Sequence, residues 1–120
     1  MTTPTPPTVS SCATAPSYVW GEVCSGWRLL DAAGLSVIEE LVPPGAAEVR
    51  HRHRLAQQFF YVLEGEASME LDGVVRTIRA GEGLAVPPGL AHRFSNRSPQ
   101  PVRFLVVSAP TTRGDREDLG

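Results

Sequence analysis

Three histidines are the residues of this chain best suited to chemistry, and two of them stand two positions apart. His51 and His53 fall in a predicted β-strand, in which alternate side chains point to the same face. Both imidazoles would therefore face one side, while Arg50, Arg52 and Arg54 would face the other. Taken alone, this short pattern also fits a solvated basic strand or an anion-binding patch.

The residues around the histidines form two frames of fixed spacing. In the first frame Gly45 is followed by five residues, His51-x-His53, four residues, Gln58, six residues and Gly65. In the second frame Gly81 is followed by five residues, Pro87-x-Gly89, two residues, His92, three residues and Asn96. Fifteen residues separate the two frames. Together they resemble the two motifs of the cupin superfamily.

This resemblance implies an all-β fold, the cupin double-stranded β-helix or jelly-roll barrel, built around a metal ion. The family's ligands are the His-x-His pair, an acidic residue and the histidine of the second motif. Carried over to this chain, the ligands are His51, His53, Gln58 and His92. Gln58 stands where a typical cupin has Glu. Gln57 is an alternative ligand, since the family tolerates three or four intervening residues, but the count back from Gly65 selects Gln58.

A ligand set of three histidines and one glutamine leaves the charge of a divalent ion uncompensated by the protein. The bound ion should therefore be a strong Lewis acid, and the loss of an anionic ligand disfavours a higher oxidation state. Zn²⁺, Ni²⁺, Mn²⁺ and Fe²⁺ all suit such ligands. An empty barrel with hydrogen-bonded histidines is the alternative interpretation.

The predicted function is that of a metal-dependent enzyme that polarises a carbonyl or enol oxygen of a small organic substrate, through cyclase, isomerase or lyase chemistry. The resemblance extends to cupins with the same ligand set, among them a polyketide cyclase and enzymes that open unsaturated uronic acids. An Fe- or Cu-dependent dioxygenase and a ligand-binding module without turnover are the alternatives. Glu40 is the candidate catalytic acid or base, because only one of the adjacent Glu39 and Glu40 can face the interior.

Short strands must position these residues, because turn residues recur every eight to twelve positions between segments rich in Val, Ile, Phe and Tyr. The expected strands cover residues 27–30, 36–42, 49–53, 58–63, 67–71, 74–78, 83–86, 92–95 and 102–108. Asp72-Gly73 predicts a two-residue hairpin turn with positive φ. In the strand 58–63, Gln58, Phe60 and Val62 should face the interior, and the residues between them should pack outward.

The chain of 120 residues has room for one domain, expected at residues 18–110 between a flexible leader (1–17) and a polar tail (111–120). Its eleven basic residues, all Arg, against thirteen acidic ones argue against a general nucleic-acid surface. No apolar run is long enough to span a membrane and no secretory signal is visible, so we expect a cytoplasmic protein. A homodimer is expected to cover the open sheet edge and the apolar outer face.

Overall fold

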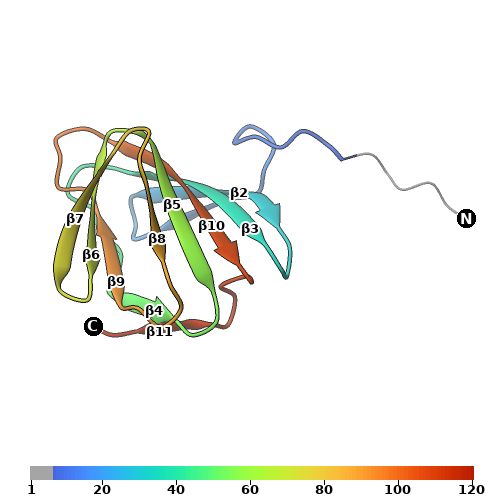
Figure 1. The fold of residues 1–120 in the computed structure, drawn as a ribbon. Coiled ribbons are helices and arrows are strands. Elements are labelled where there is room, and N and C mark those ends of the chain that lie inside the picture. Colours follow the sequence, from blue (N-terminus) through green and yellow to red (C-terminus); the bar gives the residue numbers. More distant parts are fainter. Residues whose placement is uncertain (1–6) are drawn as a thin grey trace, which may run out of the picture.

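The computed structural model describes residues 7–120, which form two antiparallel sheets that face each other (Figure 1). The strands are β1 (Ser17–Trp20), β2 (Cys24–Asp31), β3 (Ser36–Val42), β4 (His51–His53), β5 (Gln57–Glu64), β6 (Glu66–Leu71), β7 (Val74–Arg79), β8 (Gly83–Val86), β9 (His92–Ser95), β10 (Val102–Ala109) and β11 (Arg116–Asp118). One sheet has the order β1-β2-β3-β10-β5-β8 and the other β11-β4-β9-β6-β7. The described residues include no helix with the length and hydrophobicity needed to cross a membrane. The predicted all-β jelly roll is confirmed.

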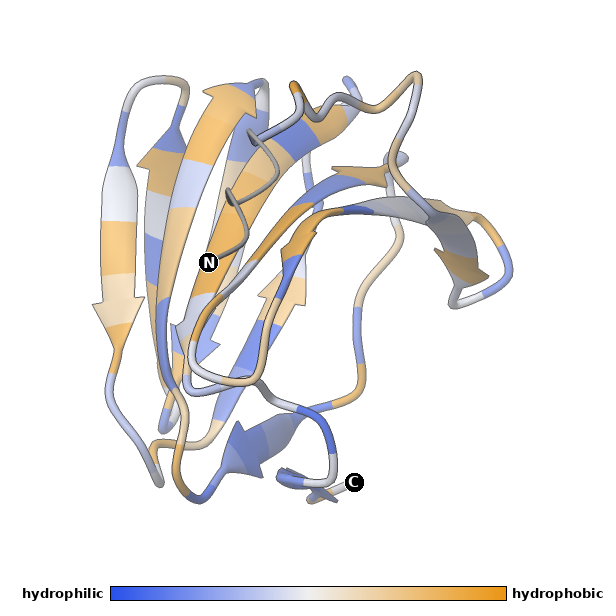
Figure 2. Ribbon diagram, turned by 90° about the vertical axis from the view of Figure 1, so that its right-hand side faces the viewer, coloured by the Kyte–Doolittle hydropathy of each residue, from blue (hydrophilic) through white to orange (hydrophobic). Residues whose placement is uncertain are grey.

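The hydrophobic core lies between the two sheets and follows from the alternation of side chains along each strand. In β5 the side chains of Gln58, Phe60 and Val62 are buried, whereas those of Phe59 and Tyr61 are exposed, as predicted. Figure 2 shows the same alternation of hydrophobic and hydrophilic residues along several other strands. The inward-facing side chains of each strand therefore contribute to one shared hydrophobic core.

The hairpin between β6 and β7 has the predicted turn. Leu71 pairs with Val74, and the two residues between them have positive φ angles, 48° for Asp72 and 90° for Gly73. Asp tolerates this left-handed conformation better than most residues, and Gly adopts it without steric cost. This turn fixes the register between β6 and β7, and β6 pairs on its other side with β9, the strand that contains His92.

The strand expected at residues 49–53 is shorter in the structure and covers only His51–His53. The Val49 carbonyl oxygen lies 2.7 Å from Nδ1 of His51, and the backbone N–H of Glu48 donates to the carbonyl of Phe94. The Val49 carbonyl is thereby engaged by a side chain, while Glu48 keeps a single backbone hydrogen bond to β9 outside the continuous strand. β1 was not predicted, and β2 begins three residues earlier than residue 27, at Cys24.

The segment after Pro110 differs from the polar tail that the sequence suggests. β11 pairs with β4, with Arg116 opposite His53 and Asp118 opposite His51. Just before β11, the Asp115 carboxylate accepts hydrogen bonds from three consecutive backbone N–H groups, those of Arg54, Leu55 and Ala56. The segment needs no apolar residues, because backbone pairing and these charge-assisted hydrogen bonds hold it in place. Both strands are strongly hydrophilic and lie together near the C-terminus (Figure 2).

Candidate metal centre

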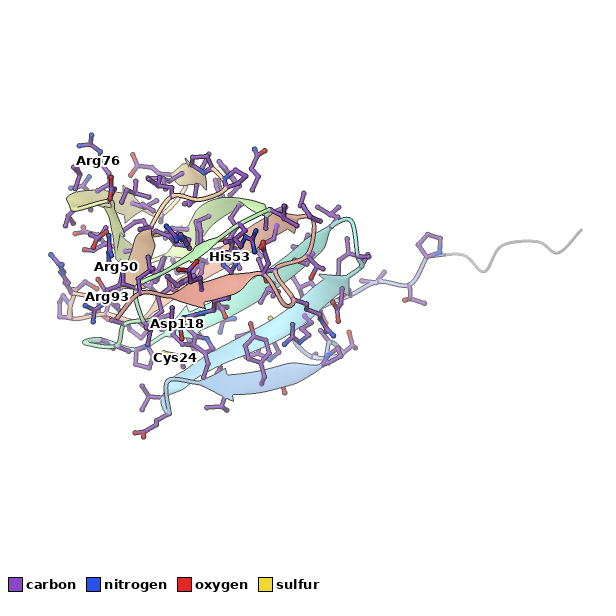
Figure 3. The ribbon with its side chains drawn as sticks, turned by 90° about the horizontal axis from the view of Figure 1, so that it is seen from below. Cys24, Arg50, His53, Arg76, Arg93 and Asp118 are labelled. Atoms are coloured by element: carbon purple, nitrogen blue, oxygen red, sulfur yellow. The ribbon has the colours of Figure 1, made fainter. Side chains whose placement is uncertain are left out.

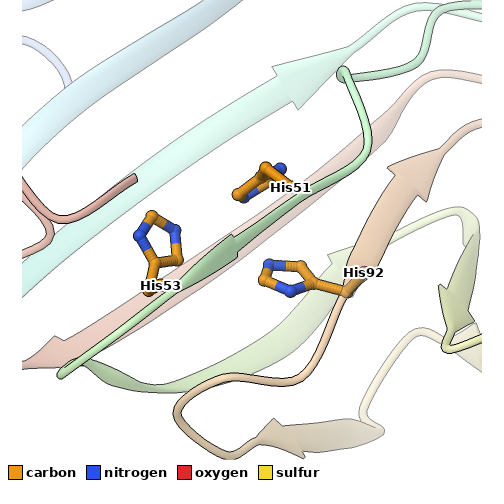
Figure 4. A group of neighbouring side chains, drawn as sticks. All are labelled: His51, His53 and His92. Atoms are coloured by element: carbon orange, nitrogen blue, oxygen red, sulfur yellow. The ribbon is translucent and has the colours of Figure 1, made fainter. Parts of the chain in front are cut away.

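Three histidine side chains from two neighbouring strands point toward one another inside the barrel (Figure 4). β4 contributes His51 and His53, and β9 contributes His92, which is directly opposite His51 in the sheet. Each offers one ring nitrogen, and these nitrogens all lie within 4.8 Å of one another. Only 1 to 6% of each histidine is exposed. The structure therefore brings together the two motifs that are far apart in sequence.

Backbone carbonyls orient two of the three imidazole rings. Nδ1 of His51 lies 2.7 Å from the Val49 carbonyl oxygen, and Nδ1 of His92 lies 3.0 Å from that of Leu90. A carbonyl oxygen can only accept a hydrogen bond, so each Nδ1 carries the proton and each Nε2 keeps a lone pair. Nε2 of His92 is buried without a partner among the described residues. This is the tautomer that a metal-binding imidazole requires.

Gln58, on β5 of the facing sheet, presents its side chain to the same cavity as His51 and His53. Its Nε2 donates a hydrogen bond to Oγ of Ser108 at 3.1 Å. Its Oε1 is buried and has no hydrogen-bond partner among the described residues. Gln57 is exposed and does not line this cavity. Of the two glutamines, only Gln58 lines the cavity that His51 and His53 line.

The cavity has a volume of about 240 Å³ and opens beside these residues. Phe60 forms part of its wall, whereas Val62 and Phe94 do not line it. They belong to the hydrophobic core, where the Phe94 and Phe104 rings stack with centroids 4.1 Å apart. The cavity wall is therefore partly polar, since Arg28, Glu40, Glu48 and Arg116 line it together with Phe60.

Glu40 lines this cavity, and the neighbouring Glu39 does not. Glu39 faces the other side of the sheet, where Arg103 pairs with it. Oε2 of Glu40 accepts a hydrogen bond of 2.8 Å from the Tyr18 hydroxyl. Burial raises the pKa of Glu40 to about 7, although the Tyr18 hydrogen bond and the charges of Arg116 and Arg28 oppose the shift. A carboxyl group with a pKa near neutrality can both accept and donate a proton.

Residues 38–108 match the family described as cupin domain, a span that contains all four expected ligands. The chain belongs to the cupin family. Two characterised relatives are similar to this cupin over part of their length. It is 33% identical to the polyketide synthase CurC of Streptomyces cyaneus over 70 residues, which is 58% of this chain and 46% of that protein.

The second relative is the HTH-type transcriptional regulator PuuR of Escherichia coli, 31% identical over 78 residues, which cover 65% of this cupin and 42% of the regulator. The chain spans between 46 and 60% of the length of the first three curated relatives that it matches. The shared region is therefore one part of each larger protein.

Solved structures with the same fold include two enzymes. A sugar phosphate isomerase of the cupin superfamily from Silicibacter pomeroyi superposes with a TM-score of 0.76 at 26% identity, covering 88% of this chain and 76% of the isomerase. The polyketide cyclase RemF from Streptomyces resistomycificus superposes with a TM-score of 0.78 at 23% identity, covering 90% and 82% of the two chains. At this identity the second comparison supports the fold alone.

The donor atoms of this cupin fit a divalent metal ion. Three buried imidazoles lie together, and Gln58 lines the same cavity as His51 and His53. Two polar atoms of these residues, Nε2 of His92 and Oε1 of Gln58, have no partner among the described residues. A buried polar atom without a partner costs about 1 to 3 kcal/mol, so such atoms in one place indicate an absent ligand. A group of three histidines in a cupin thus suggests a metal site.

Burial also keeps the three imidazoles in the neutral form that binds metals. It lowers the pKa of His51 to about 3 and that of His53 to about 4, and it lowers the pKa of His92 as well. The sequence alone suggests loss of metal below a histidine pKa of about 6.5. In the folded protein, the three histidines therefore become protonated only at a lower pH.

These shifts predict how the stability of the metal-free protein depends on pH. The unfolded histidines bind protons below about pH 6.5, whereas the folded ones resist protonation down to about pH 4 and 3 for His53 and His51. Their contribution to the free energy of unfolding is therefore complete above pH 6.5 and is lost as the pH falls. Urea unfolding in the presence of a chelator, at several pH values from 4 to 8, measures this loss.

The two carboxyl groups in the cavity oppose this dependence. Burial raises the pKa of Glu48 to about 8 and that of Glu40 to about 7, so their contribution is present at low pH and lost as the pH rises. In a Glu48→Gln variant, the free energy of unfolding should therefore decrease less above neutral pH. Its decrease below pH 6.5, caused by protonation of the histidines in the unfolded state, should be easier to measure. A free energy of unfolding that stays constant from pH 6.5 to 4 in this variant would contradict the prediction.

The sequence analysis did not identify several polar residues of the cavity, among them Tyr18, Glu48 and Arg116. Glu48 lies in the loop before β4, where its Oε1 accepts the Phe94 backbone N–H at 2.9 Å and its Oε2 lies 3.9 Å from Nδ1 of His51. Tyr18 lies next to the expected leader and Arg116 lies in the expected tail. No spacing pattern marks them, because the fold brings them to the cavity from three separate segments.

Proposed function

We propose that this cupin is a metal-dependent enzyme in which His51, His53, Gln58 and His92 hold one divalent ion. The observation that carries the proposal is the buried Oε1 of Gln58, which faces the cavity beside the histidines without a hydrogen-bond partner among the described residues. An amide oxygen and neutral imidazoles are common ligands of first-row divalent metals. When bound by such neutral ligands, the ion would supply Lewis-acid polarisation of a substrate carbonyl or enol oxygen.

The residues of the chain would handle the proton in this reaction. Glu40 would take a proton from carbon next to the carbonyl group, or return it, because its pKa of about 7 suits transfer in either direction. The Tyr18 hydroxyl, bonded to Oε2, would keep the carboxyl group in position. The apolar side chains of Ile38, Phe60 and Val106 would limit the access of water to the same cavity.

Known relatives support this class of reaction. A sugar phosphate isomerase shares the fold and 26% of the aligned residues, and a polyketide synthase is 33% identical over the cupin region. Isomerisation and cyclisation both suit an ion that activates an oxygen without changing its oxidation state. We therefore place cyclase, isomerase or lyase chemistry ahead of oxidation.

A second candidate function is the binding of a small ligand without turnover. The similarity to the transcriptional regulator PuuR over 78 residues favours it, because this region belongs to a protein described as a regulator. The same residues would then hold the ligand, and no proton transfer would follow. The two functions differ in whether a bound carbonyl compound exchanges its protons.

A Gln58→Glu variant tests the enzymatic proposal. The added carboxylate should tighten metal binding and neutralise part of the field on the substrate oxygen. Proton exchange should then slow by roughly 5- to 150-fold, which corresponds to about 1 to 3 kcal/mol in the barrier. The measurement is the exchange of the carbon-bound protons of hydroxyacetone in deuterated water, followed by NMR, together with metal affinity from competition with a chelator.

Gln57→Glu is the matched control, since it adds the same charge to the same strand outside the cavity. It should leave both metal affinity and exchange unchanged. Oxygen consumption by the Gln58→Glu protein equal to or above that of the unmodified protein would support a dioxygenase instead. Metal binding with no exchange in either protein would support the binding module.

A further inference from the structure

Two arginines, one from each sheet, reach the wall of the metal cavity. Arg28 lies on β2, and Arg116 lies on β11 at the edge of the other sheet. The guanidinium carbon of Arg28 lies 4.6 Å from the centre of the Tyr18 ring. Among residues 7–120, no side chain or carbonyl forms a hydrogen bond or ion pair with this guanidinium group. A cation on a cavity wall that forms no direct ion pair keeps its donors available to a ligand.

Arg116 is held in place but keeps hydrogen-bonding capacity. Its Nε pairs with Oδ1 of Asp118 at 2.6 Å, and its Nη2 lies 3.4 Å from the Val49 carbonyl oxygen. Nη1 has no partner within the described part of the chain. Arg116 lines the same cavity as Glu40 and Glu48, and its charge acts to lower the pKa of both carboxyl groups.

Figure 3 labels Asp118 and His53, on β11 and β4, toward the middle of the molecule as seen from below. Asp118 pairs with Arg116, and Arg116 is directly opposite His53 in the sheet. The hydrogen bonds of Asp115 to the backbone of residues 54–56 fix the start of the same segment. Arg116 is thus anchored to the strand that presents two of the three histidines.

We propose that Arg28 and Arg116 bind the carboxylate of a small organic acid whose remaining atoms occupy the metal cavity. The inference rests on the proposed function and gives the substrate class of the same site. A cavity of about 240 Å³ is larger than the cavity of about 150 Å³ that holds benzene in an engineered protein. The substrate would therefore be about the size of one substituted ring. Guanidinium groups suit this role because their donors match a carboxylate.

The charges of the cavity allow a single negative group to bind. Glu40 and Glu48 share the wall with the two arginines and would repel an anion if both were ionised. The Tyr18 hydroxyl donates a hydrogen bond to Glu40, and the Phe94 backbone N–H donates one to Glu48. Among the described residues, neither carboxyl group forms an ion pair with Arg28 or Arg116, so both guanidinium groups keep donors for an anionic ligand.

The test compares benzoate with benzamide, which has nearly the same shape and no charge. The full-length, metal-loaded protein is titrated with each probe at pH 6.5, and binding is followed by NMR. Benzoate should bind more tightly, and Arg28→Gln and Arg116→Gln should each weaken benzoate binding by about tenfold, as expected for a charge-assisted hydrogen bond. Benzamide binding should not change.

Arg76→Gln is the control, because it removes the same charge from β7, at the far edge of the sheet that contains β11 (Figure 3). It should leave benzoate binding unchanged. Arg116→Lys retains the charge and should recover part of the lost affinity. If Arg116→Gln disturbs β11 and lowers the melting temperature, the effect of Arg28→Gln on benzoate binding tests the inference.

Three results would overturn the inference. The first is equal binding of benzoate and benzamide to the unmodified protein. The second is benzoate binding that does not depend on either arginine, as expected for an anion bound by the metal alone. The third is a more than tenfold tighter binding of phenyl phosphate than of benzoate through the same arginines, which would indicate a phosphate site instead of a carboxylate site. The anion site and the proposed function can also fail separately. Benzoate binding that depends on the arginines in a protein without metal would support the anion site and count against the proposed metal-dependent function.

Discussion

A His92→Ala variant is expected to lose its divalent metal. His92 is the one histidine supplied by β9, its exposed fraction is 1%, and its Nε2 has no partner among the described residues. Without it, the site keeps one pair of imidazoles from a single strand. Loss of groups that merely orient metal ligands typically costs 10- to 100-fold in metal affinity, so loss of a ligand should cost about 100-fold or more.

The measurement is elemental analysis of protein purified without an affinity tag, followed by competition with a chelator. The unmodified protein should contain close to one ion per chain, and the variant almost none. Ser95→Ala is a suitable control, because Ser95 lies on the same strand three positions after His92, so that strand alternation places it on the opposite face. Full metal occupancy in the His92→Ala protein would show that the proposed ligand set is wrong.

A Glu40→Gln variant is expected to retain its metal and to lose most of its proton-exchange activity. General acid–base catalysis by a positioned side chain contributes about 10²- to 10⁴-fold. The substitution preserves the shape of the side chain, and its amide oxygen can still accept the Tyr18 hydrogen bond. The fold should therefore survive, while the group that transfers the proton is removed.

The exchange of hydroxyacetone protons measures this loss, and its pH profile separates catalysis from packing. In the unmodified protein the rate should change near pH 7, following the pKa of Glu40, whereas the residual rate of the variant should be independent of pH in this range. Glu39→Gln is the control, since Glu39 lies next to Glu40 but faces Arg103 on the other side of the sheet. Exchange at the normal rate in the Glu40→Gln protein would remove Glu40 from the mechanism.

The sequence could predict the features that depend on fixed spacing or on strand alternation. The spacing of the two frames predicted a fold that brings His51, His53 and His92 together, as the structure shows. The alternation of side chains in β5 predicted that Gln58 faces the interior. The hairpin at Asp72-Gly73 was predictable because few residue pairs favour two positive φ angles in succession.

Other features depend on contacts between segments that no local pattern marks. β11 consists of Arg, Glu and Asp, and a strand of this composition looks like a solvated tail unless its partner is known. Its stability comes from pairing with β4 and from the Asp115 carboxylate, which acts on residues about sixty positions earlier in the chain. Arg116, Arg28 and Glu48 could not be assigned to the cavity for the same reason.

The length of β4 has a consequence for how the proposed metal ion would be gained and lost. β4 has only three residues, and His51 is paired with His92 on one side and Asp118 on the other. An ion held by His51 and His92 would cross-link β4 and β9 in the folded state and would stabilise that state by mass action. His51 and His53 are already neighbours before folding and can capture an ion early. Release, in contrast, requires β4 and β9 to separate, so the lifetime of the bound metal should follow the rate of local unfolding.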